Sequence, residues 1–300
     1  MTSKKAPVFN SIKLGSPSSK KLLILLAGYP DSELSGWGEV IPELAKDYRL
    51  FCLCYPGFSS KSGTGTADSL PKWGYTWKEL LAGLNNTIED LLQSEQKQHQ
   101  ANYQSFTLVT HDWGAHIGLV YQNQFPKRVD KLVLLDVGML KTPKPLQLLV
   151  IILYQLWFAT SYLLSQLISQ TFGSVFFNLF VGTPLLKWVG PCPHDLTLTN
   201  TRNPQEIHVN MCYLYYHFWR ALIIRKDSLP KPKFPTCPVL FLYGTRKRCL
   251  FHDERFLNKI ERTEGCAYKA METGHWIPLF DPKGVVRELR TFMSADRSKL

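Results

Sequence analysis

An aspartate stands at the tip of a strand, turn and helix pattern near the middle of the chain. In "SFTLVTHDWGAHIGLV", Asp112 separates an apolar run from a helical pattern, with the small residues Thr110 and Gly114 two positions to either side. Small neighbours permit the tight turn of a nucleophile elbow, whose usual resident is serine. A carboxylate is already ionised, so we expect Asp112 to attack carbon and form an ester, and the amide of Trp113 to stabilise the oxyanion during ester hydrolysis.

Hydrolysis of such an ester requires a water molecule and a general base. The segment "METGHWIPLFDP" places His275 in a loop after the last predicted strand, where this arrangement of elements expects its histidine. A Gly-His pair alone is more often an ordinary surface turn, and it is the elbow upstream that makes His275 the candidate base. Because no serine occupies the elbow, serine esterase chemistry is disfavoured.

The elements that must position these two residues form an alternating series. Strands are predicted at 21–28, 48–57, 105–110, 131–136, 237–244 and 267–272. Helices are predicted near 37–44, 76–97, 114–124, 253–262 and 283–294. Short strands that are apolar on both faces and alternate with helices indicate an α/β fold, with a mostly parallel sheet covered on both sides.

The alternation is interrupted once, after Met139, by a long stretch with helical patterns only. Too little core-forming pattern lies on either side of this stretch to build two independent domains. The sequence therefore predicts one α/β core, formed by residues 1–139 and 230–300, and a helical cap inserted at 140–229.

Composition and charge exclude several classes of protein. The 300 residues are 45% apolar and suffice for a substantial core, and the net charge of +11 comes from scattered basic residues. We expect a weak attraction to anionic surfaces and no nucleic-acid partner. No phosphate loop, dinucleotide fingerprint or metal-ligand spacing is present, so neither a cofactor nor a metal is predicted.

The cysteines and the start of the chain indicate a compartment. Seven cysteines without a CxxC pair favour a reducing environment over a disulfide framework. The basic start has no apolar segment behind it, so secretion is not expected and the cytoplasm is the predicted location.

The predicted cap contains an unusual uncharged stretch. Residues 145–186 include no Asp, Glu, Lys, Arg or His, and part of this stretch is long enough to cross a bilayer. A spanning helix would interrupt a sheet that is completed later in the chain, which is topologically awkward. Two other interpretations remain open: peripheral contact with a membrane surface, and a cap helix that packs on the core and lines an apolar pocket.

Several segments together resemble the epoxide hydrolases of the α/β-hydrolase superfamily, a group that includes the haloalkane dehalogenases. The resemblance is carried by "LAGYPDSELSGWGEVIPELA", "CYPGFS", "HDWGAHIG", "YQNQFPKRVDKLVLLD", "YQLWF" and "GHW", spread over 20–280. It implies the α/β-hydrolase fold, Asp112 as nucleophile and a second oxyanion amide at Tyr29. Ala27 stands where the family commonly has histidine.

The acid that orients His275 does not stand at the position that the family commonly uses. The family commonly places an aspartate four residues after the tyrosine of "LYGTRK", and that position here is Lys247, which cannot accept the imidazole hydrogen bond. Asp136, 24 residues after the nucleophile, resembles the alternative acid position of many haloalkane dehalogenases. We therefore expect Asp136 to be the acid, with Asp253 in reserve.

The family also implies two cap tyrosines that donate hydrogen bonds to the epoxide oxygen. Tyr154 of "YQLWF" stands where the first is expected. The segment "CYLYYHFWR" offers Tyr213, Tyr215 and Tyr216 for the second, of which Tyr216 is preferred.

The resemblance predicts a hydrolase that converts lipophilic epoxides to diols, with a small apolar substrate and water as its partners. A haloalkane dehalogenase, with Trp113 and a donor near Trp37 holding the halide, is an open alternative. A protein that only binds an apolar ligand or a partner is another, because Lys247 replaces the common acid. The oligomeric state is left open.

Overall fold

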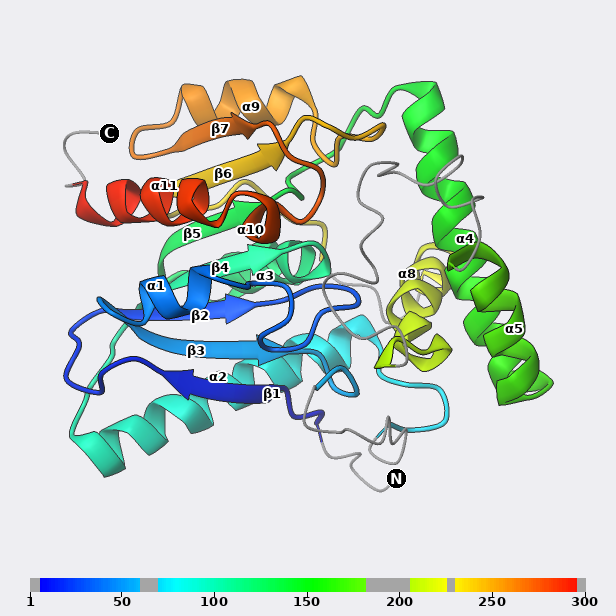
Figure 1. The fold of residues 1–300 in the computed structure, drawn as a ribbon, viewed down its shortest axis with the longest axis horizontal. Helices are drawn as coiled ribbons and strands as arrows, with labels where there is room; N and C mark the ends of the chain where they lie inside the picture. Colours follow the sequence, from blue (N-terminus) through cyan, green and yellow to red (C-terminus); the bar gives the residue numbers. More distant parts are fainter. Residues whose placement is uncertain (1–5, 60–69, 182–205, 226–229, 296–300) are drawn as a thin grey trace.

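A seven-stranded sheet forms the centre of the computed structural model, which describes residues 6–59, 70–181, 206–225 and 230–295 (Figure 1). The strand order is β1-β3-β2-β4-β5-β6-β7, and only β1 is antiparallel to its neighbour. The strands are β1 (Asn10–Leu14), β2 (Leu22–Leu26), β3 (Arg49–Cys54), β4 (Phe106–His111), β5 (Val129–Leu135), β6 (Val239–Gly244) and β7 (Ala267–Met271). This is the order and direction of an α/β-hydrolase sheet, as the resemblance implied.

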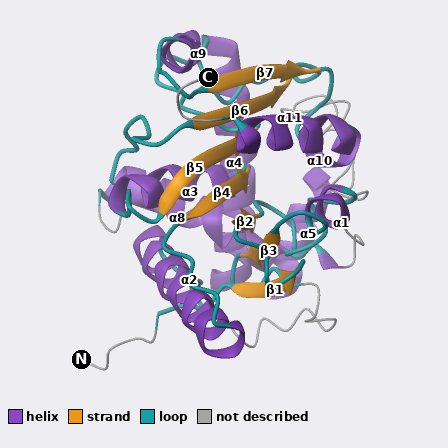
Figure 2. Cartoon of the chain, turned by 90° about the vertical axis from the view of Figure 1, so that its left-hand side faces the viewer, coloured by secondary structure: helices purple, strands orange, loops and turns teal. Residues whose placement is uncertain are grey.

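Helices cover both faces of the sheet, because its central strands are apolar on both (Figure 2). One face packs against helices α1 (Val40–Leu44), α10 (Ile277–Phe280) and α11 (Pro282–Ser294). The other packs against α2 (Trp77–His99), α3 (Trp113–Gln124) and α9 (Glu254–Glu261). In β2, Leu23 and Leu25 belong to the core on the first face. The alternate side chains of the same strand belong to the core on the second face, and these are Leu22, Ile24 and Leu26.

The cap follows β5 and precedes β6. Its described elements are α4 (Pro145–Leu167), α5 (Gln170–Val181), the short 3-10 helix η3 (Val209–Cys212) and α8 (Tyr213–Ile224). They lie beyond the carboxyl ends of the parallel strands, on the right of Figure 1. All of them fall within the insertion predicted at 140–229, whose bounds stay a prediction.

Most elements of the α/β core were predicted from the sequence to within a few residues, except β1 and α10, and the cap was predicted as helical without bounds for its individual helices. The strand β1 has only a weak apolar alternation and depends on pairing with β3. The helix α10 is a single turn directly after the histidine loop, too short for a periodic pattern. Helix α1 starts at Val40, three residues later than the apolar spacing suggested.

Candidate active site

The turn between β4 and α3 holds Asp112 in a backbone conformation that few side chains adopt. Its φ is 53° and its ψ is −124°, so the chain reverses sharply and the carboxylate projects above the sheet. The turn is crowded: a Cβ on Gly114 would lie 2.4 Å from the carbonyl oxygen of Leu26, and one on Gly28 would lie 2.4 Å from the Cβ of Asp112. The predicted elbow is therefore present, with glycine where the chains approach most closely.

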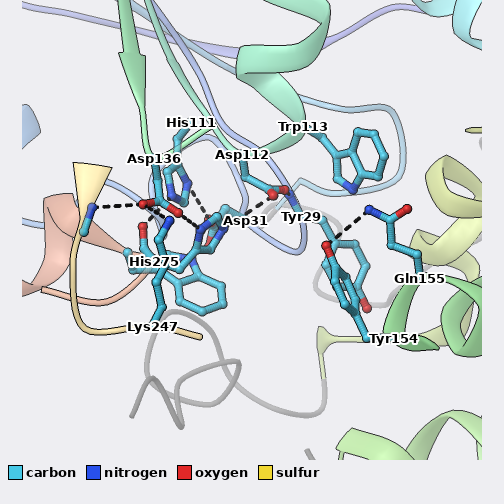
Figure 3. A network of polar contacts seen from close by, with 12 residues as sticks. Tyr29, Asp31, His111, Asp112, Trp113, Asp136, Tyr154, Gln155, Lys247 and His275 are labelled. Atoms are coloured by element: carbon cyan, nitrogen blue, oxygen red, sulfur yellow. Dashed lines mark hydrogen bonds and ion pairs between the residues drawn. The ribbon is translucent and has the colours of Figure 1, made fainter. Parts of the chain in front are cut away.

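Each oxygen of the Asp112 carboxylate has a separate neighbour (Figure 3). The backbone amide of Tyr29 donates a hydrogen bond of 2.9 Å to Oδ2. Nε2 of His275 lies 3.4 Å from Oδ1. Burial alone would raise the pKa of Asp112, but the hydrogen bond and charge of His275 outweigh it and lower that pKa. Asp112 is therefore ionised, with one oxygen already at an oxyanion donor.

The imidazole of His275 bridges two carboxylates. Its Nδ1 lies 2.5 Å from Oδ2 of Asp136, while Nε2 faces Asp112. Burial would lower the pKa of His275, but the charge of Asp136 and the hydrogen bonds to both carboxylates raise it well above its usual value. Loss of either negative charge must consequently make the imidazole less basic and easier to deprotonate.

Asp136 is fully buried immediately after β5 and accepts hydrogen bonds from three groups. Oδ2 accepts from His275, and Oδ1 accepts from the amide of Gly244, at 3.0 Å, and from the ammonium of Lys247. The side chain of Lys247 is itself completely buried. Burial would raise the pKa of Asp136, but the charges of Lys247 and His275 lower it. Lys247, which stands where the family commonly has an aspartate, thus stabilises the carboxylate of Asp136.

A second group of buried side chains, not predicted as part of the site, supports the histidine loop. The Nε2 of His111 is 3.0 Å from the carbonyl oxygen of His275 and donates to it. Asp31 accepts a hydrogen bond of 3.0 Å from the indole of Trp276, and its carboxylate lies 3.7 Å from Nδ1 of His111. All of these residues lie within the segments "GYPDS", "HDWG" and "GHW", so the motifs signalled them without showing their roles.

The cap contributes aromatic side chains opposite Asp112, of which Tyr154 is one (Figure 3). The hydroxyl of Tyr154 accepts a hydrogen bond of 3.2 Å from the side chain of Gln155. The ring of Tyr215 lies 5.2 Å from that of Trp113 and 6.3 Å from that of Tyr154. Burial, followed by the charge of Asp112, raises the pKa of Tyr215 well above its usual value. The hydroxyl of Tyr215 is therefore protonated near the carboxylate.

Tyr216, the tyrosine preferred from the sequence, points elsewhere. Its ring stacks on Trp73 at 5.7 Å and lies 5.5 Å from Tyr162. Consecutive residues on a helix are rotated by about 100°, so α8 can turn only one of Tyr215 and Tyr216 toward Asp112. In the structure the ring beside Trp113 and Tyr154 is that of Tyr215 and not that of Tyr216.

Two further predicted residues are also placed away from Asp112. Trp37 is buried in the core between the sheet and α1, with Val40 and Ile277. Asp253 caps α9 and accepts hydrogen bonds from backbone amides at 2.8–3.0 Å, those of Phe256, Lys141 and Thr142. Asp253 is therefore a structural capping residue. Among the described residues, no group of His, Cys, Asp or Glu side chains is arranged to hold a metal ion.

A carboxylate at a tight strand-to-helix turn, a histidine and a second carboxylate, brought together by the loops of such a sheet, are the arrangement expected of a hydrolase of the α/β class. Residues 21–281 match the family model for the alpha/beta hydrolase fold, and the chain belongs to that family. This match confirms the α/β-hydrolase superfamily that the sequence resembles.

Two curated relatives show the range of this similarity. A cis-3-alkyl-4-alkyloxetan-2-one decarboxylase from Shewanella oneidensis is 26% identical over 248 residues, which are 77% of this chain and 71% of that protein. Epoxide hydrolase 1 from Caenorhabditis elegans is 27% identical over 114 residues, 38% of this chain and 24% of that protein.

Solved structures share the fold at low sequence identity. The epoxide hydrolase of Bacillus megaterium in complex with an inhibitor has a TM-score of 0.65 and 20% identity, covering 96% of this chain and 97% of that one. A marine microorganism esterase has a TM-score of 0.59 and 16% identity, covering 95% and 99%. At these identities the likeness establishes the fold alone.

Proposed function

We propose that this protein hydrolyses lipophilic epoxides to diols through an ester on Asp112. The observation that carries the proposal is the pair of contacts on its carboxylate: the amide of Tyr29 on one oxygen and His275, held by Asp136, beside the other. An oriented carboxylate with a neighbouring base suits a reaction that alternates between ester formation and ester hydrolysis.

In the first step, Oδ1 of Asp112 attacks a ring carbon and the carbon–oxygen bond of the epoxide breaks. The leaving oxygen is an alkoxide and requires a proton donor. Tyr154 and Tyr215 place phenol groups on the cap side of the carboxylate, and we assign them this role. One of them gives its proton to the opening ring, which leaves a hydroxyl group on the bound ester and a tyrosinate on the enzyme.

In the second step, His275 takes a proton from water and the resulting hydroxide attacks the ester carbonyl carbon. Esterification removes the charge of Asp112, one of the contributions that raise the pKa of His275, so at this stage the imidazolium gives its proton through water to the tyrosinate and becomes a free base. The amide of Tyr29, joined by that of Trp113 at the start of α3, stabilises the oxyanion. When the tetrahedral adduct collapses, the leaving diol oxygen takes the remaining proton of the attacking hydroxide and the carboxylate of Asp112 re-forms. The proton that His275 took from water stays on the imidazole and restores the resting enzyme.

The side chains around the reacting carboxylate favour an apolar substrate. Phe158 lies 5.4 Å from the ring of Tyr29 and 5.0 Å from that of Tyr215, and the indole of Trp113 adds a further aromatic surface. Such walls stabilise hydrocarbon by burial and supply few hydrogen bonds. A small lipophilic epoxide and water are therefore the proposed partners, in a cytoplasmic location that stays a prediction.

The test is to trap the ester. A His275→Gln variant, mixed with lipophilic epoxides of different chain length, should gain the mass of one whole substrate, and peptide mapping should place the adduct on Asp112. Asp112→Ala with His275→Gln is the matched control and should gain nothing. A folded His275→Gln protein that stays unmodified across the panel would contradict covalent catalysis.

A β-lactone substrate is a second candidate, favoured by the greater coverage of the Shewanella oneidensis relative. That protein matches 77% of this chain, whereas the epoxide hydrolase from Caenorhabditis elegans matches 38%. An oxetan-2-one also has a strained ring whose alkyl carbon–oxygen bond a carboxylate can break. The products separate the candidates, because a diol contains an added water, whereas decarboxylation yields an alkene and CO₂.

The two other interpretations of the sequence have less support. A halide site would need a second donor beside Trp113, and Trp37 lies in the core on the other face of the sheet. A binding-only protein was suggested by Lys247, but Lys247 supports a complete chain of contacts from Asp136 through His275 to Asp112.

A further inference from the structure

The outer side of α4 exposes leucines in a regular row. Leu146, Leu149, Leu153 and Leu156 follow one another at intervals of three or four residues, and Leu167 continues the row at the end of the helix. Leu146 is 73% exposed, Leu149 52% and Leu153 46%. This spacing marks one face of a helix, and in a water-soluble helix the apolar face normally packs on the core. Here the row of leucines faces away from the core, because the buried side chains of α4 lie on the opposite face of the helix.

Helix α5 extends the same apolar surface. Phe172, Val175 and Leu179 are exposed at the same spacing. Between the two rows, Trp157 of α4 and Phe176 of α5 stack with their ring centres 4.2 Å apart, and both are half-buried. Trp157 follows Leu153 by one helical turn and Phe176 follows Phe172 by one turn, so the stack joins the rows. We call the eight row residues and this stack the cap patch.

Helices α4 and α5, which carry the cap patch, lie at the outer edge of the molecule, on the side of the cap away from the sheet (Figure 1). Contiguous apolar surfaces of this kind mark sites of interaction with proteins or membranes. Charge distinguishes these two partners. Residues 145–181 carry no charged side chain, so the row lacks the flanking acidic and basic residues that specify a helical partner.

The charges at the border of the cap patch are basic. Lys141 and Lys144 are exposed directly before Leu146, and within residues 145–181 and 206–225 the single acidic side chain is Glu206. A second copy of this chain would bring like charges together, whereas a bilayer offers hydrocarbon to the leucines and phosphate to the lysines.

Helix α4 is, within the described residues, the one helix long and apolar enough to cross a membrane. Its inner face is nevertheless part of the protein: Tyr154 and Gln155 are buried on the cap side of Asp112 (Figure 3), Phe158 is buried beside the ring of Tyr29, and α5 and α8 pack along the helix. Crossing the bilayer would remove these contacts. The geometry fits a helix that lies in the membrane surface with one face immersed.

We propose that the cap patch docks on the surface of a lipid bilayer. One side of α4 then rests in the acyl chain boundary while its other side carries Tyr154 on the cap side of Asp112, so that one helix diameter, ~10 Å, separates the lipid from the side chains of the site. Docking itself does not depend on the proposed chemistry. Its consequence for the substrate does rest on the proposed function: a lipophilic epoxide dissolved in the bilayer reaches the site without crossing water.

The test is flotation of the full chain with vesicles of phosphatidylcholine containing phosphatidylserine. We expect the wild type to float, and Leu149→Glu with Leu153→Glu to bind at least about tenfold more weakly, because two leucines leave hydrocarbon and two carboxylates repel the anionic surface. The matched control is Val8→Glu with Tyr268→Glu, which adds the same charge at two exposed apolar side chains on the surface of the α/β domain, outside the cap. This variant should bind the vesicles within about twofold of the wild type.

Three results would overturn docking: a wild type that stays in solution, a control variant that loses binding as strongly as the patch variant, or a wild-type dimer in light scattering that the patch variant converts to monomer without any binding to vesicles. An Asp112→Ala variant should float like the wild type, so failure of the chemistry and failure of docking are separate results. If both proposals hold, the patch variant keeps its turnover of a water-dispersed epoxide and loses turnover of one embedded in vesicles.

Discussion

The core side and the cap side of the site differ in the kind of interaction that holds their side chains. On the core side, Asp112, His275, Asp136 and Lys247 form a buried chain of alternating charges held by backbone amides. On the cap side, Tyr154, Phe158 and Tyr215 meet through ring contacts and few hydrogen bonds. Charges fixed inside a low-dielectric core give the chemistry its geometry, whereas apolar contacts select hydrocarbon with little geometric restriction. Changes on the core side should therefore affect catalysis by orders of magnitude, and changes on the cap side should affect it less.

The largest expected effect is the loss of the nucleophile. Asp112→Ala removes the atom that forms the ester, and we expect kcat on a lipophilic epoxide to fall by at least about 10⁴-fold. The measurement is diol formation at saturating substrate, with thermal unfolding to verify the fold. A residual activity within about tenfold of the wild type would show that another group performs the reaction. It would contradict the assignment of the chemistry to the core side of the site.

The acid is expected to have the next largest effect and to combine catalysis with stability. Asp136→Asn removes the partner that orients His275 and leaves the buried ammonium of Lys247 without its carboxylate. We expect kcat to fall by about 10²–10⁴-fold, and the free energy of unfolding to fall by about 3–5 kcal/mol.

A double variant separates these two effects. Lys247→Met in the Asp136→Asn background removes the unpaired charge, so stability should recover by about 2–4 kcal/mol while kcat stays low. Chemical denaturation and steady-state kinetics on the single and double variants measure both. Recovery of activity together with stability would mean that Asp136 acts only through folding.

The same chain of charges predicts a dependence of stability on pH. The pKa of His275 is raised in the folded protein, so the stability that its protonated form contributes is fully present below the unfolded value of about 6.5 and is lost as the pH rises through the folded value. The difference in unfolding free energy between the wild type and His275→Gln should shrink as the pH rises from about 6.5 to about 10, the pKa of His275 in the folded protein. A difference that grows over this range would contradict the bridging geometry.

The sequence predicted the arrangement of side chains better on the core side of the site than on the cap side. The sequence pointed to Asp112 by its strand, turn and helix pattern, to His275 by its loop after the last predicted strand, and to Asp136 by the family resemblance. The structure brings the three side chains together, and their roles stay predictions. The support from Lys247, Asp31 and His111 was missed, because it depends on contacts between loops far apart in the chain. On the cap, the choice between Tyr215 and Tyr216 depends on the rotation of α8 about its axis, which only packing sets.

The two adjacent tyrosines of α8 offer a matched test on the cap side. Tyr215→Phe removes one proposed donor while keeping the ring contacts, and we expect kcat to fall by about 10²-fold at most, since Tyr154 remains. Tyr216→Phe, one residue further along the helix, should change kcat by less than about twofold, because its ring packs on Trp73 and Tyr162. Single-turnover measurements of ester formation and ester hydrolysis should show the loss in Tyr215→Phe in ester formation only. The reverse order of effects would return the donor role to Tyr216.

The smallest expected effect lies at the junction between the two sides. Asp253 accepts hydrogen bonds from the amides of Lys141 and Thr142, where the chain enters the cap, and from Phe256 at the start of α9. Asp253→Ala should lower the free energy of unfolding by about 1–2 kcal/mol, as loss of a helix cap does. The kcat of this variant should stay within about twofold of the wild-type value, because the carboxylate of Asp253 contacts these amides and a hydroxyl, whereas His275 is held by Asp136. If the orientation of His275 depended on where the chain enters the cap, Asp253→Ala would instead match Asp136→Asn. A comparable loss of kcat with the fold intact would show this dependence and would contradict the separation of the core side from the cap side.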